Sequence, residues 1–103
     1  MASHIYNTTF GVDPAVEKEF IAWLRREFIP LSVDSGEYFK QPELLRVHTQ
    51  DKQVNSIALH MRADDLNDIN LWYEDEGARL FDFIQQTWQG RVVFFSTTLS
   101  VID

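Results

Sequence analysis

Two long segments of this sequence carry apolar residues at helical spacing, and each lies between segments of strand character. The first begins at Asp13-Pro14, where Asp13 is suited to cap a helix and Pro14 to occupy its first turn. A kink or restart is expected at Pro30, which lacks a backbone donor. The second covers residues 64–90, with a bend expected near residues 76–78 because Gly77 lies within the pattern.

The flanking segments at residues 4–12 and 91–102 are rich in β-branched and aromatic residues, and residues 44–62 predict two further strands around a polar turn. The order is therefore strand, helix, strand, strand, helix, strand. Short right-handed connections then favour an α+β fold, a ferredoxin-like βαββαβ sandwich. Its four-stranded antiparallel sheet would carry two helices on one face, and residues 1–103 would form a single domain.

Charge and composition exclude several classes of function. The net charge is −7 and only nine residues are Lys or Arg, which disfavours nucleic acid and anionic membranes as partners. The chain has no cysteine, which excludes disulfides and cysteine-ligated zinc. It also lacks a signal-peptide pattern and any apolar run of membrane-spanning length. These features predict a soluble, cytoplasmic protein that requires no cofactor.

The central hairpin carries charged and imidazole groups among its apolar residues. In the third strand, Ile57, Leu59 and Met61 share one side and predict the core face. Placing Leu45 and Val47 on that same face requires an odd-length turn or a bulge around residues 50–53. With this register, the face away from the helices would carry Arg46, His48, His60 and Arg62.

That second face is not expected to be plainly solvent-exposed, because the last strand is apolar on both of its alternating sides. Something should cover it, and in a chain this short the obvious candidate is a second copy. We therefore expect a homodimer formed through the sheets. The interface residues predicted for it are Val92, Phe94, Ser96, Thr98 and Ile102.

The segments IYNTTFGVD, WLRREFIP, LLRVH and FFSTTLSVI resemble a group of small bacterial proteins known as a domain of unknown function. The architecture of that group is similar to the dimeric α/β barrels, in which two ferredoxin-like sheets face each other. The resemblance extends over nearly the whole chain and implies fold and dimer. Related barrel families include cofactor-independent monooxygenases, haem-dependent enzymes and ligand-binding regulators, so it does not select an activity.

The candidate chemistry is limited to a few groups. His4, His48 and His60 fall on three strands without a paired ligand spacing, so no metal is expected to be required. Arg46 and Arg62 could bind a small anion, or could instead pair with acidic side chains of a partner. The candidate ligand-binding residues are Tyr6, Arg46, His48 and His60. Should they not bind, the cleft beside Trp72 and Tyr73 is the next location to consider, although core packing is the favoured explanation of these two residues.

Three functions remain open. The first is a homodimeric module that binds a small anionic or aromatic molecule, in a cleft between the sheets or between sheet and helices. The alternative is a metal-free, monooxygenase-like enzyme acting on an aromatic or quinone-like substrate, with His48 or His60 as general base. The third is a dimer that serves only protein interaction.

Overall fold

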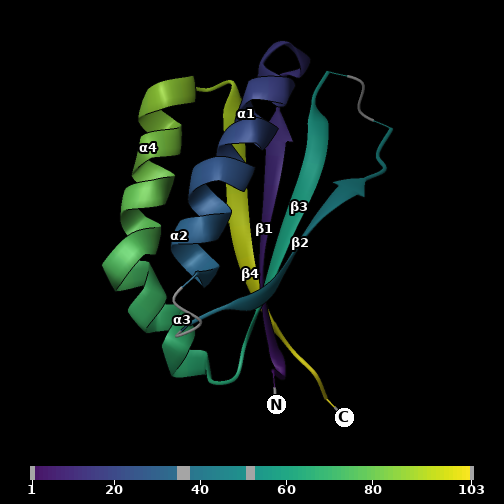
Figure 1. Ribbon diagram of the computed structural model, residues 1–103. Coiled ribbons are helices and arrows are strands. Elements are labelled where there is room, and N and C mark those ends of the chain that lie inside the picture. The colour runs from purple at the N-terminus through teal and green to yellow at the C-terminus, as the bar shows by residue number, and fades with distance from the viewer. Residues whose placement is uncertain (1, 35–37, 51–52, 103) are drawn as a thin grey trace.

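The computed structural model describes residues 2–34, 38–50 and 53–102. Its strands are β1 (His4–Val12), β2 (Lys40–Val47), β3 (Asn55–Ala63) and β4 (Val92–Ser100). They form one antiparallel sheet in the order β2-β3-β1-β4. Both helical segments pack on the same side of this sheet and leave its other side uncovered (Figure 1). The predicted ferredoxin-like sandwich is confirmed.

Each helical segment is built from several pieces. The first consists of a 3-10 turn η1 (Pro14–Val16), α1 (Glu17–Trp23), a π-helical segment η2 (Leu24–Phe28) and α2 (Ile29–Val33). The second consists of α3 (Leu66–Trp72), a π-helical segment η3 (Tyr73–Gly77) and α4 (Ala78–Trp88). Asp13 caps the first segment, since its Oδ1 accepts a hydrogen bond from the backbone N–H of Ala15 at 2.9 Å.

Both irregularities expected from the sequence coincide with changes in helix type. Pro30 lies in the first turn of α2, directly after the π-helical segment η2. Gly77 closes η3 and is buried against the indole of Trp72. A Cβ atom at residue 77 would lie only 2.6 Å from Cζ3 of Trp72, so glycine is what allows this close approach.

Aromatic rings dominate the core between sheet and helices. The largest side chains that are fully buried include Trp72, Phe10, Phe20 and Phe28. The indole N–H of Trp72 donates to Ser32 Oγ at 3.1 Å, and Ser32 Oγ donates to the carbonyl of Phe28 at 2.8 Å. This chain of hydrogen bonds satisfies the indole N–H of Trp72 and the hydroxyl of Ser32 within the core, and it joins the two helical segments.

The register predicted for β2 is wrong. Leu44 pairs with Leu59 and Arg46 with Ile57, so Leu44 and Arg46 lie on the helix side of the sheet. The irregularity lies between Lys40 and Glu43, whereas the predicted turn includes residues 51 and 52, which lie outside the described residues. Because β2 is an edge strand, Arg46 can reach past the core to form an ion pair with Glu17 of α1.

Within the described ranges, no helix combines the length and the apolar character that crossing a membrane requires.

Candidate functional site

The four residues predicted to bind a ligand do not share a face of the sheet. Tyr6 is buried on the helix side, where its ring packs against Phe39 and Trp72. Arg46 also lies on the helix side, and His48 follows the end of β2 as an exposed residue. Only His60 lies on the uncovered side, because its neighbours Leu59 and Met61 both point into the core. The predicted common placement is therefore wrong.

The side of the sheet away from the helices, hereafter the open face, consists of four rows of paired residues. Two adjacent rows are largely apolar, a third is polar, and the fourth is mixed. From β2 to β4, the rows are Val47-Ser56-Gly11-Val93, Leu45-Ala58-Thr9-Phe95, Glu43-His60-Asn7-Thr97 and Lys40-Arg62-Ile5-Leu99. Phe95 is 62% exposed and Val93 is 59% exposed. The open face thus carries a solvent-exposed apolar area at one end.

The residues predicted for the dimer interface lie elsewhere. Phe94 pairs with Phe10 in the core, and the same alternation places Val92, Ser96 and Thr98 on the helix side. Ile102 follows β4 and is almost fully exposed. The predicted placement on the open face is therefore wrong for the four β4 residues. Both sides of β4 are apolar at its start, so the pattern of the strand itself did not distinguish them.

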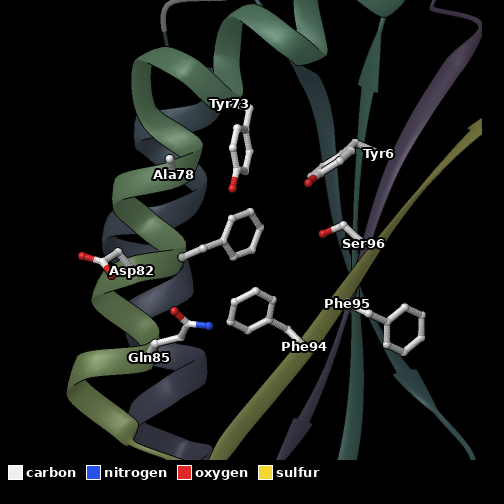
Figure 2. A pocket seen from close by; sticks show the side chains of 9 residues that line it. Tyr6, Tyr73, Ala78, Asp82, Gln85, Phe94, Phe95 and Ser96 are labelled. Atoms are coloured by element: carbon white, nitrogen blue, oxygen red, sulfur yellow. The ribbon is translucent and has the colours of Figure 1, made fainter.

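A cleft lies between β4 and the helix η3–α4, on the helix side of the sheet (Figure 2). Its volume is about 440 Å³, within the ~300–1,000 Å³ that is typical of small-molecule sites. Tyr6 of β1, Tyr73 of η3 and Ser96 of β4 direct their hydroxyl groups into it (Figure 2). Phe81, Asp82, Gln85 and Phe94 are among its other lining residues.

One wall of the cleft is a column of aromatic rings. The centroid of Phe81 lies 4.7 Å from that of Phe94, with the planes inclined by 23°, and 6.3 Å from that of Tyr73. Tyr73 is the first residue of the π-helical segment η3 and is 47% exposed at the mouth of the cleft. The change in helix type therefore occurs at a residue that lines the cleft. Irregular helical turns of this kind are frequent at functional sites.

The polar wall is formed by Tyr6 and Ser96. Burial raises the pKa of the Tyr6 hydroxyl above its ordinary value of 10.0, a hydrogen bond with Ser96 partly offsets this rise, and nearby Tyr73 adds to it. Ser96 Oγ also lies 3.0 Å from Thr8 Oγ1 on the neighbouring strand. Tyr6 therefore remains a neutral phenol at physiological pH, able to donate or accept a hydrogen bond.

Gln85 and Asp82 complete the rim on α4. The amide of Gln85 points toward the cleft, whereas the carboxylate of Asp82 points away from it (Figure 2). Asp82 Oδ2 accepts a hydrogen bond from Gln86 Nε2 at 2.9 Å. None of the described residues that line the cleft is a histidine, lysine or arginine. The arrangement offers hydrogen bonds and aromatic contact, and it lacks the imidazole base expected of the alternative enzyme.

A second groove, about 480 Å³ in volume, runs along the outer surface between the two helical segments. Phe83 lies in it, 46% exposed and stacked on Trp23 at 5.1 Å. Arg79 forms an ion pair with Glu76 at 2.6 Å within the same groove. This surface lies on the side of the helices away from the cleft.

Metal binding has no evident location in the described part of the chain, where no three His, Asp or Glu side chains gather closely enough to hold an ion. His4 Nδ1 lies 2.8 Å from Ser100 Oγ, and His60 belongs to the polar row of the open face. Ser96, Gln85 and Phe81 were not predicted from the sequence as residues of a cleft. Tyr73 was predicted only as part of the alternative ligand location beside Trp72 and Tyr73. Gly77, four residues later in the same helical run, was the sequence signal of the irregular turn that begins at Tyr73.

Comparison with solved structures identifies proteins of the same fold. A candidate antibiotic biosynthesis monooxygenase from Bacillus cereus matches with a TM-score of 0.69 and 12% identity, over 100% of this chain and 96% of that one. A dimeric ferredoxin-like protein from an uncultured marine organism matches at 0.67 and 13% identity, over 98% and 96%. A dimeric protein of unknown function from Bacteroides fragilis matches at 0.54 and 13%, over 94% and 95%.

At these identities the likeness shows the fold alone. A search of curated proteins finds no match to the chain. The model of one protein family matches residues 3–102, which is nearly the whole chain and includes every element of the sheet and both helical segments. The chain therefore belongs to the family described as Domain of unknown function (DUF4286).

Proposed function

We propose that the protein is a homodimeric module that binds a small molecule in the cleft between β4 and the helix η3–α4. The observation that carries this proposal is the convergence of three hydroxyl groups, from Tyr6, Tyr73 and Ser96, beside a column of aromatic rings. A mainly aromatic lining with a few placed polar groups is the usual composition of a ligand site. A cytoplasmic location is part of the same proposal.

Binding is favoured over catalysis by the groups that line the cleft. The enzyme alternative needs a general base within hydrogen-bonding reach of its substrate. His60 is on the opposite side of the sheet, and exposed His48 lies beyond the end of β2, the edge strand opposite β4. The raised pKa of Tyr6 makes its phenolate a minor species at neutral pH, so this residue is suited to hydrogen bonding and not to proton abstraction.

The open face supplies the argument for the dimer. Phe95, Val93 and Leu99 expose large apolar side chains there, in a sheet whose other side is covered by helices. Association of two open faces would remove these side chains from water without blocking the cleft on the other side of β4. Two of the structurally similar proteins are described as dimeric, which is compatible with this arrangement.

The cleft can be tested with 2-phenylethanol, a neutral molecule with one ring and one hydroxyl group. We expect saturable binding in isothermal titration calorimetry. Ser96→Ala and Gln85→Ala should each weaken binding about three- to tenfold, the effect of losing one hydrogen bond. Thr87→Ala is the matched control, because Thr87 is exposed on the same helix α4 but does not line the cleft. Unchanged affinity in both cleft variants would refute the proposed location.

A further inference from the structure

We infer that the natural ligand of the cleft is a small organic cation, an ammonium group attached to an aromatic or similarly apolar body. This inference rests on the proposed function and adds the sign of the ligand's charge. Three features of the cleft support it: the charges around it, the hydrogen-bond acceptors within it, and the aromatic rings of its wall.

The charges around the cleft are negative. Asp82 is the charged residue among the described residues that line it. The nearest cation on the same helix, Arg79, is held on the outer surface by Glu76 and by the carbonyl of Asp75. The acidic residues Glu74 and Asp75 directly follow Tyr73, and the whole chain has a net charge of −7. An anionic ligand would enter this field without a cation to pair with.

The interior can satisfy the hydrogens of an ammonium group. The hydroxyl oxygens of Tyr6, Tyr73 and Ser96 are all acceptors that lie in the cleft. Asp82 has an exposed side chain at the rim, so its carboxylate can turn toward a bound cation by rotation about its own torsions. An ammonium group would thus find neutral acceptors inside and a carboxylate at the mouth.

The aromatic wall also favours a cation. Ring faces carry negative electrostatic potential, and a cation within about 6 Å of a ring centroid is attracted to it. The rings of Tyr73, Phe81 and Phe94 follow one another along the cleft wall. Tyr6 lies across the cleft from Tyr73 (Figure 2). The expected anion site does not compete with this inference, because Arg46 is already paired with Glu17 on another part of the molecule.

Three molecules that differ mainly in charge test the inference: 2-phenylethylamine, 2-phenylethanol and phenylacetate. We expect the amine to bind the full-length protein about tenfold more tightly than the alcohol at neutral pH and low salt, and phenylacetate to bind most weakly. Asp82→Asn should remove most of the preference for the amine over the alcohol. Glu27→Gln is the control, since it changes the net charge equally but lies in the outer groove.

The outcomes separate the two proposals. If the alcohol binds in the cleft as tightly as the amine, or if phenylacetate binds best, the cation is refuted while the binding function stands. If the preference survives in Asp82→Asn and falls in Glu27→Gln, the assignment of charge to this cleft is refuted. If none of the three molecules binds, both the cation and the proposed function are refuted.

Discussion

Replacing Phe95 by Asp is predicted to convert the proposed homodimer into a monomer. Phe95 is 62% exposed in the single chain and lies in an apolar row of the open face. With about 200 Å² for a phenylalanine side chain, association can bury about 120 Å² of it, or about 3 kcal/mol per chain at ~25 cal/mol per Å². A symmetric dimer contains the residue twice, so about 6 kcal/mol is lost, which raises the dissociation constant by about four orders of magnitude.

Sedimentation velocity over a range of protein concentrations measures this change directly. Phe83→Asp is the control, because Phe83 has a comparable exposure of 46% but lies in the outer groove between the helices. It should leave the dimer intact, whereas Phe94→Asp should unfold the chain by placing a carboxylate against Phe10 and Phe81. A wild-type chain that is monomeric at micromolar concentration would refute the dimer. A Phe95→Asp variant that remains dimeric would refute the assignment of its interface.

Further predictions concern the core and the cleft. Gly77→Ala should lower the free energy of unfolding by about 1–3 kcal/mol, measured by thermal denaturation, because the new methyl group collides with Trp72; an unchanged melting temperature would contradict the packing. Ser32→Ala should lower the free energy of unfolding by about 1–3 kcal/mol, measured by urea denaturation, because it leaves the Trp72 indole N–H unpaired. The same substitution should have little effect in a Trp72→Phe background, which lacks that N–H. The free energy of unfolding should fall as the pH rises from about 9 to 11, because burial raises the pKa of Tyr6 in the folded state above that in the unfolded state. Tyr6→Phe should reduce this fall, and an identical pH profile in the variant would contradict the assignment to Tyr6.

The order of the elements and the helix cap at Asp13 could be predicted from the sequence because local patterns determine them. The apolar spacing, the cap at Asp13, and the glycine at residue 77 each act within a few residues. Strand faces could be assigned where one side was clearly more apolar, as for Ile57 and Leu59 of β3. These assignments agree with the structure.

The faces of the two edge strands could not be predicted in the same way. In β4, Val93 and Phe95 on one side are as apolar as Val92 and Phe94 on the other, so alternation gives no answer. In β2, the choice depended on the register with β3. The cleft was beyond local patterns for another reason: its residues come from β1, η3, α4 and β4, and only the packing of these elements brings them together.

The central claim is that the two sides of β4 have separate roles, with the ligand on the helix side and the second chain on the open side. Side-chain NMR spectra of the protein titrated with 2-phenylethylamine test it most directly. The claim predicts ligand-dependent shifts at Phe94 and Ser96, with Val93 and Thr97 shifting only when the dimer is diluted or disrupted. Ligand-dependent shifts concentrated at Val93 and Thr97, with Phe94 and Ser96 unchanged, would contradict it.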